Sequence, residues 1–243
     1  MTTTPLQRVW RFLRGDGSLT IAVCILVLWI FLLAPLREMN DIGGLAGDLA
    51  FAAVLALGAI FVFEPRPIMR LFLLFLISAM VVRLVDVVVS GGALVDALGY
   101  VLSAIAAFML GWLLLVRVLR DGRININRIM GSVGVFLLIG IVFANGFRLV
   151  ALYADGAFAI GGTPVPAAEF MPRVVYFSFV TLTSLGYGDI TPVHPFARSL
   201  VTMEALTGQL FLAILVARLV AMEIEWRHEQ RDKHDAHDEP HQH

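Results

Sequence analysis

The chain has 243 residues, of which 59% are hydrophobic and only 15% are charged. Soluble domains carry about 25% charged residues, so this composition indicates an integral membrane protein rather than a soluble domain. A formal net charge of -1 gives no reason to expect nucleic acid as a partner. The single cysteine, Cys24, excludes an intrachain disulfide framework and a metal site built on several thiols.

After a polar start at residues 1–18, six apolar runs follow one another along the chain. They cover residues 19–34, 45–63, 68–89, 94–116, 129–153 and 200–222. Each is close to the ~20 residues that a bilayer-spanning helix needs, so the sequence predicts six transmembrane helices. The first run follows basic residues, as a signal-peptide core does. It is longer than such a core and lacks a clear cleavage site, so we expect it to remain as a helix.

The basic residues predict how these helices are oriented. Most of them precede the first run, connect the second to the third and the fourth to the fifth, or follow the sixth: Arg8, Arg11, Arg14, Arg66, Arg70, Arg117, Arg120, Arg123, Arg128, Arg227, Arg231 and Lys233. By the positive-inside rule, both termini then lie in the cytoplasm. We therefore expect a multi-pass protein of the cell membrane, either plasma or inner.

The fourth run, residues 94–116, contains no arginine. Voltage-sensing helices carry an arginine at every third position through the membrane, so weak or absent voltage sensing is expected. Arg117, Arg120 and Arg123 have that spacing but lie at the cytoplasmic edge, where they suit anionic headgroups of membrane lipids. Residues 19–122 are predicted to form a four-helix transmembrane domain.

Between the fifth and sixth runs the pattern changes to a re-entrant loop. Residues 153–171 contain glycines and prolines and are predicted to form an extracellular turret. Pro172 suits the first turn of a helix, and residues 173–182 are too few to span a membrane. A short helix followed by a glycine-rich return points its C-terminal end at the membrane centre. The negative end of its dipole would stabilise a cation there.

The return strand contains the sequence Thr-Ser-Leu-Gly-Tyr-Gly-Asp at residues 183–189. A potassium ion that leaves water needs oxygens of similar field strength, and rings of backbone carbonyls supply them. Aiming successive carbonyls at one axis requires alternating right- and left-handed backbone, and Gly186 and Gly188 reach the left-handed form at little cost. Tyr187 is expected to point away and brace the strand, and Asp189 to end it at the outer mouth. The alternative is a glycine loop that only connects two helices.

This stretch resembles the selectivity filter of the tetrameric potassium channels, with Ser184 in place of the usual Thr and Leu185 in place of Val. The resemblance covers residues 128–222 and implies an all-α membrane fold with six transmembrane helices, a pore helix and a filter loop. It implies a homotetramer, since only one filter motif is present, and K⁺ as the permeant ion, with no other cofactor and no enzymatic activity. The implied pore module is residues 123–226. The ion-binding residues would be Thr183, Ser184, Leu185, Gly186, Tyr187, Gly188 and Asp189, with K⁺ held at Ser184, Leu185, Gly186 and Tyr187.

The sixth run carries the candidate cavity and gating residues. Gln209, Leu212 and Val216 share one helix face, which the alignment of the filters suggests lines a central cavity. Gly208 is either a bend that lets the helix open or a small residue for close packing. Glu204 lies on another flank, where it either braces the filter by hydrogen bonding Thr or Tyr groups or is a buried structural carboxyl, protonated or paired with Arg.

Residues 227–243 contain several histidines among acidic residues. Such a tract can bind transition metals, but a disordered cytoplasmic tail is favoured because its apolar content cannot support a core. Two other functions stay open. One is a subunit of a potassium uptake transporter, although those carry four filter repeats in one chain. The other is a non-conducting sensory or assembly subunit that kept the channel fold.

Overall fold

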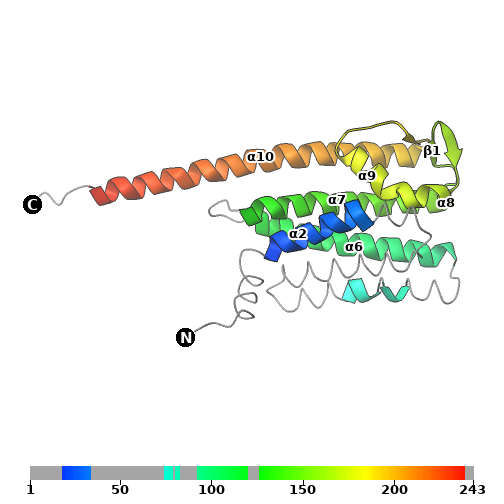
Figure 1. Ribbon diagram of the computed structural model, residues 1–243, viewed down its shortest axis with the longest axis horizontal. Coiled ribbons are helices and arrows are strands. Elements are labelled where there is room, and N and C mark those ends of the chain that lie inside the picture. The colour runs from blue at the N-terminus through cyan, green and yellow to red at the C-terminus, as the bar shows by residue number, and fades with distance from the viewer. Residues whose placement is uncertain (1–17, 34–73, 79, 83–91, 120–125, 239–243) are drawn as a thin grey trace, which may run out of the picture.

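The computed structural model describes residues 18–33, 74–78, 80–82, 92–119 and 126–238 (Figure 1). Helix α2 (Ser18–Leu28) and the π-helix η1 (Trp29–Leu33) occupy the first apolar run. The second run and most of the third lie outside the described residues. The number of helices in the domain predicted at residues 19–122 therefore stays a prediction.

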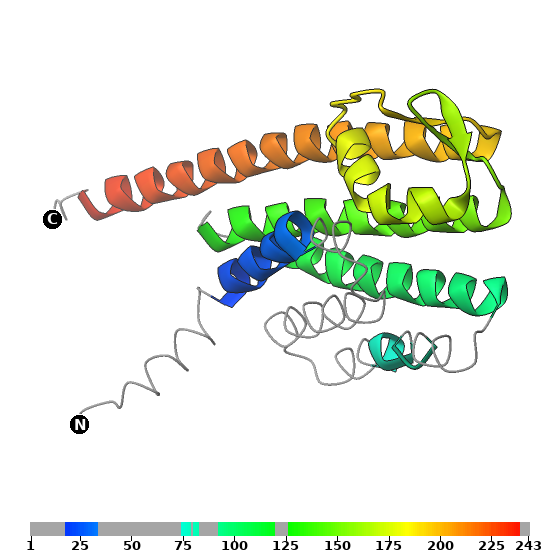
Figure 2. The same cartoon turned by 45° about the vertical axis from the view of Figure 1, so that its right-hand side comes forward.

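Three of the described helices are long and apolar enough to cross a membrane. They lie within α6 (Ala93–Val118), α7 (Ile126–Tyr153) and α10 (Pro195–Asp238). These helices coincide with the fourth, fifth and sixth apolar runs, which confirms the expectation of a mainly helical membrane protein. In Figures 1 and 2, α6 and α7 lie along one another, and α10 extends beyond them toward the C-terminus.

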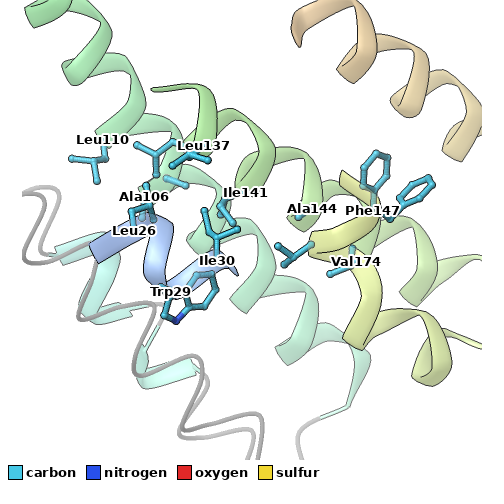
Figure 3. Packing of buried hydrophobic residues seen from close by; sticks show 14 of the residues in the cluster. Leu26, Trp29, Ile30, Ala106, Leu110, Leu137, Ile141, Ala144, Phe147 and Val174 are labelled. Atoms are coloured by element: carbon cyan, nitrogen blue, oxygen red, sulfur yellow. The ribbon is translucent and has the colours of Figure 1, made fainter. Parts of the chain in front are cut away.

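The core is built where α2 and η1 cross the α6–α7 pair (Figure 3). Ala106 on α6 is fully buried and Leu110 nearly so, and they face a cluster that includes Ile141 of α7 and Ile30 of η1. Small residues at helix contacts let membrane helices approach closely, so dispersion contacts replace the hydrophobic driving force that lipid cannot supply. This packing holds α7 in place as the support for the segment that follows it.

The turret contains a small antiparallel sheet that the sequence analysis did not predict. Its strands are β1 (Phe158–Ile160), β2 (Thr163–Val165) and β3 (Ile190–Pro192), in the order β2-β1-β3. Gly161 and Gly162 connect β1 to β2 with φ values of 58° and 84°, which suit the tight hairpin turns that need left-handed residues. Because β3 begins directly after Asp189, the sheet ties the turret to the end of the predicted filter.

Four buried phenylalanines join this sheet to the helices below it. Phe158 of β1 stacks on Phe170 with ring centroids 3.9 Å apart, and Phe177 meets both rings edge-on. Phe147 of α7 contacts Phe177 at 5.0 Å. Offset and edge-on aromatic pairs add to the stabilisation from burial alone. The cluster therefore fixes the turret against α7 and against the short helix that contains Phe177.

Helix α10 continues to Asp238, so the expectation of a disordered tail from residue 227 is wrong up to that residue. The segment has too few apolar residues for a core, but its Glu, Gln, Arg and Lys residues are good helix formers. Arg227 also pairs with Glu223 one turn earlier at 2.8 Å, the i,i+4 spacing that supports exposed helices. Propagation from the apolar part of α10 thus carries the helix into the polar tail. Residues 239–243 lie outside the described part of the chain.

The aromatic cluster yields a stability prediction. Replacing Phe158 by Ala removes a side chain that is 1% exposed and leaves a cavity. We therefore expect the free energy of unfolding to fall by roughly 3–5 kcal/mol. The control is Phe108→Ala on α6, where the ring is 59% exposed and the expected change is within about 0.5 kcal/mol. Thermal melting of the purified protein in detergent measures both. Equal losses for the two variants would contradict the assigned role of the cluster.

Candidate ion-conduction site

A short helical segment between α7 and α10 occupies the position predicted for the pore helix. It consists of α8 (Ala167–Phe170), the 3-10 turn η2 (Met171–Arg173) and α9 (Val174–Leu182). Pro172 sits in the first turn of η2, as expected for a residue without a backbone N–H. With nine residues, α9 is far too short to cross a bilayer. Its C-terminal end leads directly into the filter sequence.

The backbone after α9 alternates in handedness. Ser184, Gly186 and Gly188 have φ values of 56°, 56° and 79°, whereas Leu185 and Tyr187 between them do not have positive φ. The two glycines adopt the left-handed form expected of them. Ser184 is the one non-glycine residue in this region of φ in the described part of the chain, and left-handed backbone costs such a residue roughly 1–2 kcal/mol. The alternation is the geometry that turns successive carbonyls toward one side.

Two hydrogen bonds hold the outer end of this strand. The Tyr176 hydroxyl of α9 donates to Asp189 Oδ2 at 2.9 Å, and the Gly161 N–H of the turret donates to the Asp189 carbonyl oxygen at 2.9 Å. The bond to the Asp189 carboxylate raises the pKa of Tyr176. Sequence reasoning missed Tyr176, because its 13-residue separation from Asp189 has no local signature. Within one chain the described contacts of Tyr187 include no hydrogen bond, and its side chain is 68% exposed.

At the inner end, the sixth predicted helix meets the filter. Gln209 Nε2 of α10 donates to Ser184 Oγ at 3.0 Å. Leu212, Val216 and Val220 follow at helical spacing and are, like Gln209, exposed in the single chain. This exposed face of α10 is the one that the sequence analysis assigned to a cavity. The contact of Gln209 with Ser184 adds a specific partner to that expectation.

Gly208 lies directly against the end of the pore helix. A Cβ atom at this position would overlap the Leu182 carbonyl oxygen and would lie 3.1 Å from Leu182 Cδ1. Helix α10 runs through Gly208 without interruption. The structure therefore supports close packing as a role of this glycine, because no other residue leaves room for the Leu182 carbonyl.

Glu204, one turn before Gly208, is fully buried. Its Oε1 lies 2.5 Å from Ser178 Oγ of α9, and Ser178 Oγ also lies 2.7 Å from the Gly140 carbonyl oxygen of α7. Glu204 therefore lies against the pore helix, behind the filter. The partner is a serine, however, and not one of the Thr or Tyr groups that the sequence analysis considered.

A second polar cluster, which sequence reasoning missed, lies between α6 and α7. Arg148 Nη1 donates to Asn145 Oδ1 at 3.1 Å, and its guanidinium lies 5.7 Å from the centre of the Tyr100 ring. The Tyr100 hydroxyl in turn reaches Met171 Sδ at 3.8 Å, just before the pore helix. An arginine inside the apolar run 129–153 was the available signal, since such residues are rare at membrane depth.

The segment that contains this site is similar to known ion channels. Residues 149–225, which contain the turret, α9, the filter and most of α10, match a family model described as "Ion channel". Protein LctB of Bacillus caldotenax is 30% identical over 136 residues, which is 52% of this chain and 96% of LctB. Potassium voltage-gated channel protein shk-1 of Caenorhabditis elegans is 38% identical over 82 residues, and inward rectifier potassium channel Kirbac3.1 of Paramagnetospirillum magnetotacticum is 44% identical over 46 residues. The chain belongs to the ion channel family, and two of these relatives carry the name of potassium channels.

The family model covers the pore module, and the two named potassium channels match over short stretches. The matched segments are 33% of this chain and 15% of shk-1, and 19% of this chain and 16% of Kirbac3.1. No solved structure matches the chain. The family is one of channels and not of enzymes, and its matched region is the part of the molecule in which the pore helix, the alternating strand and α10 meet.

The packing of Gly208 yields a prediction that separates it from a simple hinge. Gly208→Ala gains about 1 kcal/mol in helix propensity but forces α10 away from Leu182. We expect a lower melting temperature and a loss of ion flux. Gly111→Ala on α6 is the control, because its Cβ would lie 3.5 Å from Leu138 Cβ, an ordinary contact. If Gly208 served only as a hinge, Gly208→Ala would melt at or above the wild-type temperature and alter opening alone.

The hydrogen bond between Tyr176 and Asp189 leads to a prediction of how the Tyr176 hydroxyl titrates. A raised pKa means that the folded protein favours the phenol, so the bond stabilises the fold below pH 10, the ordinary tyrosine value, and is lost as the pH rises through the raised pKa. Asp189→Asn should lower the pKa of Tyr176. Alkaline difference absorbance measures it, with Tyr176→Phe identifying its signal among the four tyrosines. An unchanged titration in Asp189→Asn would contradict the assignment.

Proposed function

We propose that this protein conducts K⁺ passively and selectively across the cell membrane through a homotetrameric pore. The observation that carries the proposal is the alternating backbone of Ser184, Gly186 and Gly188 at the C-terminal end of a short helix. Such a strand offers main-chain oxygens on one side, and several copies around an axis replace the hydration shell of an ion. The proposed K⁺ ligands are the carbonyl oxygens of Ser184, Leu185, Gly186 and Tyr187, with the Ser184 hydroxyl at the inner end.

The exposure of the single chain supports assembly around an axis. All residues from Thr183 to Asp189 are exposed, although they lie between α9, which is largely buried, and the buried Ile190 of β3. In the most apolar stretch of α10, only 17% of the residues are buried, against 50% in the corresponding stretch of α7. A strand with unpaired carbonyls is stable at membrane depth only where it lines a cavity or is buried in protein. Further copies of the chain satisfy this requirement, because each copy supplies one strand of the ring.

The electrostatics of the site favour cations. The C-terminal end of α9, where the Leu182 carbonyl lies, carries the negative end of the helix dipole. Asp189 adds a carboxylate at the opposite end of the filter, held by Tyr176. We propose that the termini lie in the cytoplasm and that the filter opens to the outside, as the distribution of arginine suggests. Membrane lipids and K⁺ are the proposed partners besides the other copies.

The two alternative functions differ from this proposal in what they require. A potassium transporter subunit with four filter repeats per chain does not suit a sequence with one such motif. A non-conducting subunit would keep the same geometry, so only a flux measurement separates it from a channel.

Purified protein in potassium-loaded liposomes tests the proposal. We expect uptake of K⁺ and Rb⁺ with little uptake of Na⁺, because the carbonyl sites match the larger ions. Gly186→Asp and Tyr187→Ala should abolish the selectivity by displacing the carbonyls, while Phe108→Ala on α6 serves as a control remote from the pore. Equal Na⁺ and K⁺ permeability in the unmodified protein would overturn selectivity. An absence of all flux would favour a non-conducting subunit.

A further inference from the structure

Behind the filter, one hydroxyl group connects all three helical elements of the pore module. Ser178 of α9 lies 2.5 Å from Glu204 Oε1 of α10 and 2.7 Å from the Gly140 carbonyl oxygen of α7. Both Ser178 and Glu204 are fully buried. In the described part of the chain no side-chain hydrogen bond joins either residue to the filter strand, but Ser178 is on the helix that ends at it.

The single proton of the Ser178 hydroxyl limits how this group can form hydrogen bonds. A serine hydroxyl has one proton to donate, and a backbone carbonyl can only accept. If Ser178 donates to Glu204 as a carboxylate, its oxygen faces the Gly140 carbonyl at 2.7 Å with no proton between them. If Ser178 donates to Gly140, the short contact with Glu204 requires that the proton come from the glutamic acid. Only the second arrangement makes both distances hydrogen bonds.

The surroundings of Glu204 favour the same arrangement. Its second oxygen, Oε2, is buried without a hydrogen-bond partner, and no salt bridge to Glu204 occurs in the described part of the chain. Burying an isolated carboxylate is far more costly than burying a neutral carboxylic acid. A neutral acid leaves one acceptor unsatisfied at Oε2, whereas a carboxylate would leave a full charge without compensation.

We propose that Glu204 carries a proton in the folded channel and donates a hydrogen bond to Ser178, which in turn donates a hydrogen bond to the Gly140 carbonyl. We call these two hydrogen bonds the relay, and they make Glu204 a positioning residue for the filter. Helix α10 meets the pore helix at two points one turn apart, Glu204 at Ser178 and Gly208 at Leu182. The first contact is polar and directional and the second is steric. Together they set both the rotation and the depth of α9, the helix from which the filter strand begins.

Infrared spectroscopy of the purified full-length protein tests the protonation directly. A protonated carboxyl group has a C=O stretching band that a carboxylate lacks, so the difference spectrum of wild type minus Glu204→Gln isolates the band of Glu204. We expect this band at neutral pH, and we expect its frequency to change in Ser178→Ala, where the acceptor is gone. Absence of the band, or carboxylate bands in its place, would overturn the proposal. This readout does not depend on conduction, so it stands apart from the proposed function.

The positioning role is tested by flux and tetramer melting in a double-mutant cycle. Glu204→Gln keeps an N–H donor toward Ser178, so it should retain flux within about twofold of wild type. Glu204→Leu and Ser178→Ala each break the relay and should lower flux on the order of tenfold, because a buried partner is left unsatisfied. Their effects should not add in the double variant.

Several outcomes would contradict the positioning role. Additive losses would show that the two residues act independently, and a Glu204→Gln variant as damaged as Glu204→Leu would show that the charge is needed. If no variant and no wild type conducts, the proposed function fails, while the infrared band and the melting of the same variants still decide the relay. The positioning role would also be overturned if Glu204→Leu and Ser178→Ala both melted at the wild-type temperature and kept the wild-type flux.

Discussion

The architecture of the pore module depends on how closely α10 approaches the end of the pore helix. At Gly208 the two backbones are so near that any side chain would displace the Leu182 carbonyl. The polypeptide is held together there by direct backbone contact, without intervening side chains that could adapt. The position of the filter strand follows from this contact, because the strand starts one residue after Leu182 and its first residues hydrogen-bond back to α9. Both its inner partner, Gln209, and the buried Glu204 lie on the same stretch of α10.

The polar groups of this region divide into two kinds. Two pairs lie at the ends of the filter: Tyr176 with Asp189, and Gln209 with Ser184. Both pairs are exposed in the single chain, so water can replace their hydrogen bonds. The group around Ser178 is fully buried and joins α7, α9 and α10. A buried polar network costs free energy unless every member is bonded, so its geometry is far less tolerant than that of the exposed pairs. In the single chain, the buried polar contacts therefore lie behind the filter and the exposed ones at its two ends.

The turret is more than a connection between helices. Its sheet places β3 beside β1, and the phenylalanine cluster anchors β1 to α7 and α9. The outer end of the filter is therefore held from three directions: by the hairpin through Gly161, by the pore helix through Tyr176, and by the strand that continues from it. The cluster of Tyr100, Asn145 and Arg148 connects α6 to the same region through Met171. Helix α6 thus contacts the turn η2 that leads into the pore helix.

The sequence by itself determined the membrane class, the helices at the fourth, fifth and sixth apolar runs, the short helix before the filter and the left-handed glycines. Each of these follows from a local property: hydrophobic length, the position of Pro172, or the freedom of glycine at Gly186 and Gly188. The sequence did not indicate the turret sheet, the bond of Tyr176 to Asp189, or the choice of Ser178 as the partner of Glu204. These contacts join residues that are far apart in the chain, and only the packing of α7, α9 and α10 decides which of them meet. The helical tail was mispredicted because helix propagation from an apolar segment does not need a core of its own.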